Sequence, residues 1–231
     1  MRILVVAATE EEVGGLKSEF GISMSDLEGK DATNHLPAAN NCQLLTANCN
    51  LLITGVGMVA TAFELGRHLA KNQYDFALNL GIAGCFDRNI ALGDVCETVE
   101  DTFSELGAED YNEFLPIDKM GFGNGTFYPV PLPEAYNHRD AYKLTRVTAI
   151  TVNTVHGSDS SIKKITGRLN PQLESMEGAA FFYACKEYNL SCLQIRAVSN
   201  YVEKRNRDSW KIGLAIKNLN TFAVEFLKLY A

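Results

Sequence analysis

Long hydrophobic runs are absent from this sequence of 231 residues. The first apolar run, residues 3–8, is shorter than the core of a signal peptide or a membrane span. Three glutamates, Glu10, Glu11 and Glu12, follow it almost at once. We therefore expect this run to be a first buried strand, and the protein to be cytoplasmic with no membrane partner.

Basic charge is scarce as well. The chain carries 21 Lys and Arg residues against 28 Asp and Glu residues, a formal net charge of −7. Nucleic acids and anionic membranes attract proteins through basic patches, and this sequence has no stripe of Lys and Arg. We expect no nucleic-acid partner.

Metal-binding patterns are also missing. The six cysteines form no C-x-x-C pair, and the four histidines lack the spacing of zinc ligands. Cys85, Cys185 and Cys192 stand in apolar stretches, which favours buried reduced thiols. The sequence therefore predicts neither a metal site nor a bound cofactor.

The chain does contain apolar segments in which strand-like and helix-like periodicity alternate. The expected strands are residues 2–8, 43–47, 51–54, 76–82, 93–100, 146–153 and 191–198. The expected helices are residues 10–20, 57–72, 158–167, 177–188 and 208–229. This alternation predicts an α/β fold with helices on both faces of a central, mostly parallel but mixed and twisted sheet. No linker or repeat divides the chain, so we expect a single domain over residues 1–231.

Residues 101–141 break the alternation. They are rich in Gly, Pro, Asn and aromatic residues and have weak periodicity. A loop of this length in a compact domain is usually functional, so we expect it on the substrate side. The predicted strand ends should converge at one edge of the sheet, where α/β proteins bind ligands. These ends are residues 8–12, 54–57, 81–84, 153–156 and 198–201.

One of these turns, residues 55–60 (GVGMVA), matches a dinucleotide-binding fingerprint. That motif needs an acid at the end of the next strand, whereas Asp75 precedes its strand. A nicotinamide-dependent oxidoreductase is therefore an alternative, and a tight turn that requires glycine is the favoured interpretation.

Several segments, in the same order along nearly the whole chain, resemble the nucleoside phosphorylase and nucleosidase superfamily, especially methylthioadenosine/S-adenosylhomocysteine nucleosidases. They are residues 7–13 (AATEEEV), 54–57 (TGVG), 79–84 (NLGIAG) with 92–95 (LGDV), 174–180 (ESMEGAA) and 196–200 (RAVSN). Residues 105–110 (ELGAED) and 121–123 (GFG) are similar to futalosine hydrolases of menaquinone biosynthesis, as is the pair Ser199 and Asn200 followed by Arg205, Arg207 and Trp210.

The resemblance implies roles for four residues. Glu177 would accept a hydrogen bond from a ribose hydroxyl, and Met176 would pack against the sugar. Glu12 would activate water, and Arg196 would help to place it. Each charged residue also has an ordinary alternative: an acid at a helix N-terminus for Glu177, a solvated glutamate for Glu12 and an ion pair at a strand end for Arg196.

Five more residues are substrate-binding candidates by the same resemblance. Val56 and Gly81 belong to two of the matched glycine segments. Val155 and His156 lie where the nucleosidases have their base-stacking loop, although the loop in this sequence is unlike theirs. His156 could reach the base or sugar, and a loop hydrogen bond would also explain it. Phe122 could contact a 5′ substituent, although a core aromatic is an equal alternative.

Asn200 is an informative departure from the nucleosidases, which have Asp at this position. Aspartic acid can protonate N7 of a 6-aminopurine and accept from its amino group. An asparagine amide can instead donate to a 6-oxo group and accept from a protonated N7. Ile82, where many nucleosidases have Ser, is a second departure and carries no polar role. Asn200 therefore favours a 6-oxopurine nucleoside, such as futalosine with its hypoxanthine base. An asparagine that caps a turn is the ordinary alternative.

Water is the expected nucleophile. The Gly-Asp-Pro loop whose Arg binds phosphate in hexameric phosphorylases is missing, and the three glutamates in its place would repel a phosphate dianion. Phe127, Tyr128 and Arg205 or Arg207 could bind the benzoate of futalosine, although core aromatics and solvated arginines are equal alternatives. The resemblance further implies a homodimer or larger homo-oligomer that binds a small-molecule nucleoside.

Three alternatives remain beside the oxidoreductase. The first is an inosine- or guanosine-type nucleosidase or phosphorylase. The second is a methylthioadenosine/S-adenosylhomocysteine nucleosidase. The third is a non-catalytic nucleoside sensor, which the presence of both Glu12 and Glu177 disfavours.

Overall fold

A computed structural model of the chain describes the backbone of residues 1–20, 42–46, 48–134 and 141–230, and the side chains of the same residues except 42–46. His35, His138 and the side chain of Cys42 lie outside this part, as do residues 135–140 of the predicted loop.

The described strands and helices alternate along most of the chain. The strands are β1 (Ile3–Ala7), β2 (Cys42–Thr46), β3 (Cys49–Ile53), β4 (Phe76–Cys85), β5 (Val95–Phe103), β6 (Gly107–Asp110), β7 (Glu113–Pro116), β8 (Thr126–Phe127), β9 (Thr145–Thr151), β10 (Leu173–Ser175) and β11 (Cys192–Tyr201). The helices are α1 (Gly14–Glu19), α2 (Met58–Leu69), α3 (Asp159–Leu169), α4 (Gly178–Glu187) and α5 (Ile212–Lys228), with short 3₁₀ helices η1 (Glu11–Val13) and η5 (Arg207–Ser209).

Every described strand except β6 and β7 belongs to one sheet, in the order β10-β9-β5-β11-β4-β1-β3-β2, with β8 beside β5. The central strand β4 runs parallel to β1 and β11, whereas β5 is antiparallel to β11 and β2 is antiparallel to β3. Strand β10 pairs with both β9 and β4, which closes β4, β11, β5, β9 and β10 into a ring. The predicted α/β fold with a mixed sheet is confirmed.

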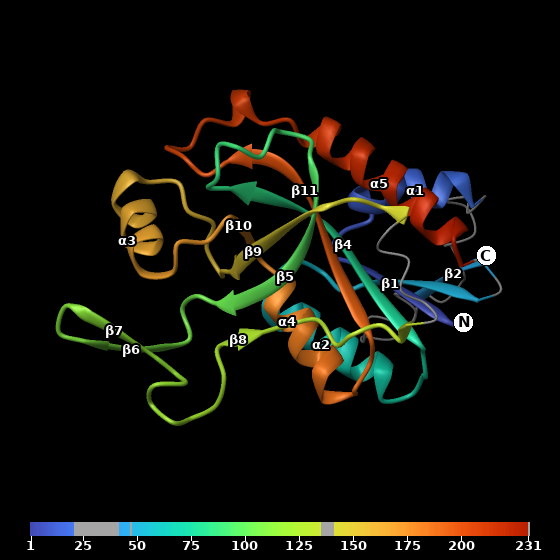
Figure 1. The fold of residues 1–231 in the computed structure, drawn as a ribbon, viewed down its shortest axis with the longest axis horizontal. Coiled ribbons are helices and arrows are strands. Elements are labelled where there is room, and N and C mark those ends of the chain that lie inside the picture. The colour runs from blue at the N-terminus through green and yellow to red at the C-terminus, as the bar shows by residue number, and fades with distance from the viewer. Residues whose placement is uncertain (21–41, 47, 135–140, 231) are drawn as a thin grey trace, which may run out of the picture.

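Helices cover both faces of the sheet, α2 and α4 on one and α1 and α5 on the other (Figure 1). Side chains of β1 point alternately to these two layers. Val5 belongs to the cluster that contains Phe226 of α5, whereas Leu4 belongs to the cluster that contains Phe181 of α4. A strand buried on both faces reads as a continuous apolar run, which is why this segment was identifiable from sequence.

The central strands are longer than the sequence predicted. The strands were expected to end near Ile82 and Val198, whereas β4 continues to Cys85 and β11 to Tyr201. The parallel pairing of these two strands continues to their ends across a register shift between Val198 and Asn200. Glycines in this stretch resemble a turn in sequence, but here they leave room for neighbouring side chains.

The predicted loop 101–141 contains more regular structure than expected. Strand β5 runs to Phe103, a β6–β7 hairpin projects from the body, and β8 follows (Figure 1). The short strand β10 was not predicted. Helix α5 begins at Ile212, later than expected, and Trp210 precedes it. These segments are short and weakly periodic, so their sequence carries little signal.

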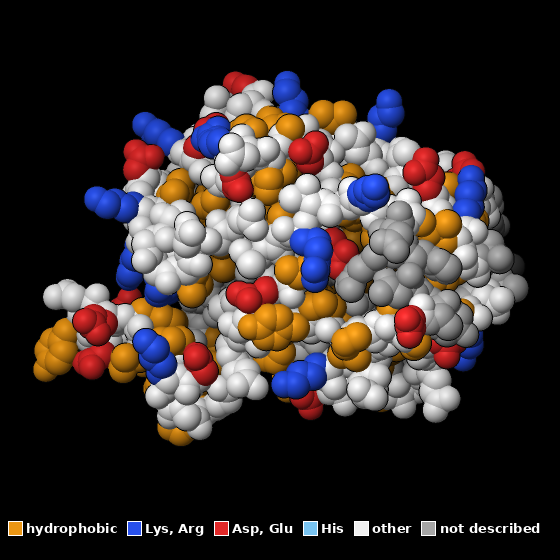
Figure 2. Space-filling view, in the orientation of Figure 1, with side chains coloured by type: hydrophobic (Ala, Val, Ile, Leu, Met, Phe, Trp, Pro, Cys, Tyr) orange, Lys and Arg blue, Asp and Glu red, His pale blue; other side chains and the backbone are white. Residues whose placement is uncertain are grey.

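No helix in the described part of the chain is both long and apolar enough to cross a bilayer. Within the same residues, no group of three His, Cys, Asp or Glu side chains is placed to hold a metal ion. Cys85, Cys185 and Cys192 are buried and free, as predicted. Acidic and basic side chains are interspersed over the face seen in Figure 2.

Candidate active site

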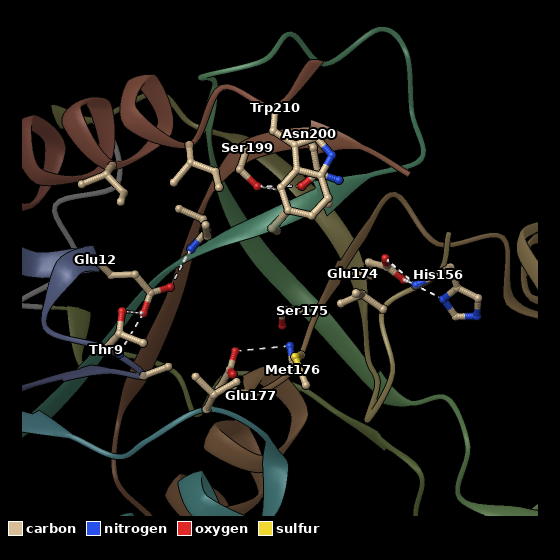
Figure 3. A pocket seen from close by; sticks show the side chains of 18 of the residues that line it. Thr9, Glu12, His156, Glu174, Ser175, Met176, Glu177, Ser199, Asn200 and Trp210 are labelled. Atoms are coloured by element: carbon tan, nitrogen blue, oxygen red, sulfur yellow. Dashed lines mark hydrogen bonds and ion pairs between the residues drawn. The ribbon is translucent and has the colours of Figure 1, made fainter. Parts of the chain in front are cut away.

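A pocket of about 440 Å³ lies where β1, β4, β10 and β11 approach one another. In Figure 3, Glu12, Glu177, Glu174 and Asn200 surround the same space. Seven of the predicted site residues line it: Glu12, Val56, Val155, His156, Met176, Glu177 and Asn200. Further lining residues include Thr9, Ser199, Glu203, Arg205 and Trp210.

Glu12 is the middle residue of η1, just beyond β1, and three donors hold its carboxylate. The backbone N–H of Ile82 donates to its Oε1 at 3.1 Å. The backbone N–H and the hydroxyl of Thr9 donate to its Oε2 at 3.0 and 3.2 Å. The residue is 8% exposed, so the alternative of a solvated glutamate does not describe it.

The electrostatic setting of Glu12 suits a base. Burial raises the pKa of Glu12 above its usual value, while the Ile82 N–H and the charge of Arg196 act in the opposite direction. A Cβ on Gly81 would lie 3.1 Å from both Arg196 Nη1 and Glu12 Oε1. Gly81 and Arg196 thus lie beside Glu12 but outside the pocket lining, and Arg196 is only 1% exposed.

Glu177 precedes helix α4 as its N-cap residue, but its carboxylate does not cap the helix. The backbone N–H of Gly57 donates to Oε1 at 2.9 Å, and that of Met176 donates to Oε2 at 3.2 Å. These bonds turn the carboxylate towards the pocket, where Met176 also lies. The position of Glu177 therefore serves the pocket rather than the helix terminus.

The glycine turn before α2 explains the dinucleotide-like motif. Gly55 and Gly57 have φ angles of 84° and 99°, a region that glycine adopts without strain. The turn directs the Gly57 N–H at Glu177. Asp75 accepts from the backbone N–H of Arg2, at the opposite end of β1. Asp75 therefore lies at the N-terminal end of the strands, whereas a dinucleotide site requires its acid at the C-terminal end.

Asn200 reaches the pocket through the register shift in β11. Val198 pairs with Ala83 and Asn200 pairs with Gly84, which leaves Ser199 as the extra residue of a bulge. The Asn200 amide is oriented by two bonds: the Ser199 hydroxyl lies 2.8 Å from Oδ1, and Nδ2 donates to the carbonyl of Tyr201 at 3.1 Å. One amide hydrogen remains to donate into the pocket.

Glu174 and Trp210 are among the pocket residues that were not predicted as site residues. Glu174 of β10 is 3% exposed and contacts His156 through the backbone N–H and Nδ1 of the histidine. Trp210 stacks under the guanidinium of Arg205, with 5.0 Å between the guanidinium carbon and the ring centroid. The available sequence signal for Glu174 was its position at the start of the matched segment 174–180 (ESMEGAA).

Phe122 does not join this pocket, contrary to prediction. It is 75% exposed and lines a second cavity of about 900 Å³ with Val59 and Phe63 of α2. The reason is that the chain leaves the sheet after β5 and carries the β6–β7 hairpin and the following turn away from β10 and β11 (Figure 1).

A buried hydrogen-bond network lies beneath the site. Asp101 of β5 accepts from Thr151 at 2.8 Å and from Gln194 at 2.9 Å. Thr151 in turn accepts from the Ala179 N–H of α4, and Gln194 accepts from Arg196. Burial raises the pKa of Asp101 to about 7. The network joins the start of α4, beside Glu177, to the strand that carries Arg196.

Gly178 makes this network close-packed, which gives a stability prediction. A Cβ at this position would overlap the Asp101 carboxylate and the Gln194 amide. We expect Gly178→Ala to lower the free energy of unfolding by about 1–3 kcal/mol, the usual cost of overpacking a core. Urea unfolding followed by circular dichroism measures the change.

Gly167→Ala is the matched control, because Gly167 lies in α3 with open space around its Cβ position. That change should stabilise the protein by roughly 0.5–1 kcal/mol, since alanine favours a helix over glycine. Equal stability of Gly178→Ala and wild type would mean that the network moves aside without cost.

Asn220 of α5 is a further residue that sequence reasoning missed. Its Nδ2 donates to the carbonyl of Glu12 at 2.8 Å, and its Oδ1 accepts from the Leu16 N–H at 2.7 Å. These bonds fix the turn that carries Glu12. A polar side chain next to Leu219 on the apolar face of a helix was the signal that could have identified it.

Known proteins are similar to this chain over nearly its whole length. A model of the phosphorylase superfamily matches residues 2–229. The futalosine hydrolase of Streptomyces coelicolor is 29% identical over 225 residues, which cover 95% of this chain and 92% of that protein.

Solved structures share the fold. A 5′-methylthioadenosine/S-adenosylhomocysteine nucleosidase from Helicobacter pylori, with butyl-thio-DADMe-Immucillin-A, aligns over 99% of this chain and 98% of its own, at a TM-score of 0.77 and 13% identity. Futalosine hydrolase from the same organism aligns over 99% and 97%, at a TM-score of 0.76 and 13% identity.

Proposed function

The chain belongs to the phosphorylase superfamily, and on that premise we propose that it hydrolyses futalosine to hypoxanthine and dehypoxanthine futalosine, a step of menaquinone biosynthesis. The observation that carries the proposal is the meeting of Glu12, Glu177 and Asn200 in one pocket. The Streptomyces coelicolor relative, which is 29% identical over most of the chain, is a futalosine hydrolase, and this supports the same substrate.

Cleavage of an N-glycosidic bond develops positive charge on the ribose ring and negative charge on the departing base. Glu177 interacts with the ribose. Its carboxylate is aimed by the Gly57 and Met176 N–H groups, and oxygen lone pairs remain to accept from a ribose hydroxyl. The same negative charge stabilises the cationic ring in the transition state.

Glu12 acts as the general base that activates the nucleophilic water. A general base must lie within hydrogen-bond reach of the water and have a pKa closer to the working pH than an ordinary carboxyl. Burial supplies the second condition, and the Thr9 and Ile82 donors fix the side chain. Arg196 lies beside Glu12, and its positive charge favours the ionised form of the Glu12 carboxyl.

Asn200 binds the purine base. Its amide is oriented by Ser199 and by the Tyr201 carbonyl, which leaves a hydrogen to donate to the 6-oxo group. The oxygen of the same amide can accept from a protonated N7. This pattern supports hypoxanthine over adenine as the leaving base.

The charge of the pocket supports water over phosphate. Among its described lining residues are five glutamates, namely Glu11, Glu12, Glu174, Glu177 and Glu203. The lining also contains one arginine, Arg205. A phosphate dianion near these carboxylates would be repelled, whereas water would not. We infer that Arg205, which stacks on Trp210 at the pocket, binds the benzoate of futalosine instead.

Base release from a panel of nucleosides tests the proposal. Dialysed enzyme should release hypoxanthine from futalosine at the same rate with and without phosphate, as followed by chromatography. Inosine, methylthioadenosine and adenosylhomocysteine should be cleaved more slowly. Strict dependence on phosphate would exclude the hydrolase, and preferred cleavage of one of the other nucleosides would identify the corresponding nucleosidase.

We also propose that the enzyme is a homodimer or larger homo-oligomer that meets through the second cavity. Val59 and Phe63 of α2 are 76% and 64% exposed, and they line this cavity with Phe122 and Tyr183. A contiguous apolar surface of this kind usually marks a protein contact. Val56, on the turn before α2, lines the nucleoside pocket, so a second copy seated here would adjoin the active site.

Phe63→Glu tests the oligomer. A buried charge at this surface should shift the protein towards a monomer in analytical ultracentrifugation and raise KM for futalosine. Tyr111→Glu is the control, because Tyr111 is fully solvent-exposed at the tip of the β6–β7 hairpin and lies outside the cavity lining. An unchanged sedimentation coefficient for Phe63→Glu would place the interface elsewhere.

A cytoplasmic location is a further proposal, supported by the five buried free thiols among the described cysteines.

A further inference from the structure

Glu174 is a pocket carboxylate to which the mechanism above gives no role. It lies in the short strand β10, which pairs with β9 on one side and with β4 on the other. The residue is 3% exposed and still lines the nucleoside pocket. Burying a carboxylate has a large desolvation cost, so a side chain in this position needs partners.

His156 is one partner of Glu174 and holds it with two donors. The backbone N–H of His156 lies 3.1 Å from Oε1, and its Nδ1 lies 2.6 Å from Oε2. Burial raises the pKa of Glu174, and these bonds with His156 oppose the rise and favour the carboxylate. A carboxylate has about four acceptor positions, so acceptor capacity remains for a ligand.

Asn200 is the neighbour of Glu174 inside the pocket. A Cβ on Gly84 would lie 3.3 Å from Glu174 Cγ and 3.4 Å from Asn200 Nδ2. The two side chains therefore flank the same glycine of β4, one from β10 and one from β11. In Figure 3 Asn200 lies beside Trp210 and Glu174 lies below it beside His156, both across the pocket from Glu12.

The edge of a 6-oxopurine presents N7, O6 and N1–H in that order. Asn200 satisfies the first two, and the adjacent N1–H requires an acceptor. In a 6-aminopurine N1 is itself an acceptor, and a carboxylate there would face a lone pair with no hydrogen between them. An acceptor next to Asn200 therefore distinguishes the two base classes at a second atom.

We propose that Glu174 accepts a hydrogen bond from N1–H of the 6-oxopurine and, together with Asn200, determines the choice of base. His156 is the positioning residue that holds the carboxylate. This inference rests on the proposed function, because N1–H belongs to the hypoxanthine base of the proposed substrate.

The test compares kcat/KM for three substrates: futalosine, its 6-amino analogue and futalosine methylated at N1. Wild-type enzyme should reject the N1-methyl substrate by about 10²-fold or more, because the methyl group removes the donor and leaves the buried carboxylate without its partner. Glu174→Gln places an amide beside N1, so its ratio of 6-oxo to 6-amino turnover should fall at least 10-fold. Glu203→Gln removes another carboxylate of the pocket and should keep that ratio.

Each outcome decides one point. Equal losses on both bases in Glu174→Gln would mean a structural role and overturn the inference. Equal cleavage of futalosine and its N1-methyl form by wild type would overturn it without any variant, even where Glu174→Gln fails to fold. If wild type releases no hypoxanthine from futalosine, the proposed function itself fails, and the inference fails with it.

Discussion

Glu12→Gln should abolish turnover and leave nucleoside binding nearly intact. We expect kcat to fall on the order of 10²–10⁴-fold, the range over which a positioned general base contributes. The dissociation constant of futalosine, measured by calorimetry with the inactive variant, should stay within about 10-fold of the wild-type KM, because the change removes a proton acceptor and keeps the size of the side chain.

The geometry explains why this one acid among three matters. Glu12 is buried and held by Thr9 and Ile82, whereas Glu10 forms an ion pair with Lys17 and lies outside the pocket lining. Glu10→Gln is therefore the matched control and should retain activity. A Glu12→Gln enzyme that keeps more than a tenth of wild-type kcat would exclude water activation by this residue.

The pH dependence gives an independent check on Glu12. A general base acts in its ionised form, so activity falls as pH drops through its pKa. Because burial raises the pKa of Glu12, the acidic limb of kcat/KM should lie above the usual glutamate value of 4.5. An acidic limb at or below that value would indicate a solvated carboxylate.

Asn200→Asp should reverse the preference for the base. The aspartate loses the amide donor to O6 and can accept from a 6-amino group, so kcat/KM for futalosine should fall by about 10²-fold or more while its 6-amino analogue gains. A competition assay with equal amounts of the two nucleosides, followed by chromatography of hypoxanthine and adenine, measures the ratio directly.

Asn206→Asp controls for the added charge. Asn206 caps η5 by accepting from the Asp208 N–H, a bond that aspartate keeps, and it lies outside the pocket lining. This variant should leave the ratio of hypoxanthine to adenine unchanged. An unchanged ratio in Asn200→Asp would show that the base is chosen by other groups.

Residues inside matched motifs were the most predictable part of the site. Glu12, Met176, Glu177 and Asn200 each stand in a matched segment, and the structure brings all four to one pocket. The substitution of Asn for Asp was visible in sequence because hydrogen-bond capacity belongs to the residue type and not to its surroundings.

Residues whose role depends on distant neighbours were not predictable. Glu174 and Trp210 stand in matched segments and Asn220 stands on the apolar face of a helix, but the sequence does not show which groups these side chains contact. Their positions follow from β10 pairing with two strands, from α5 packing over η1 and from the late start of α5. Phe122 was misplaced for the same reason, since its location depends on the path of the β6–β7 hairpin.

The sequence by itself determined the α/β class, the alternation of buried strands with helices and the chemical character of the base-binding residue. Those properties depend on residue type and on short-range periodicity. The tertiary structure decided that the Gly57 turn orients Glu177, that a bulge turns Asn200 into the pocket and that Glu174 stands beside it. These contacts join residues far apart in the chain, and only packing of the sheet brings their atoms within hydrogen-bond distance.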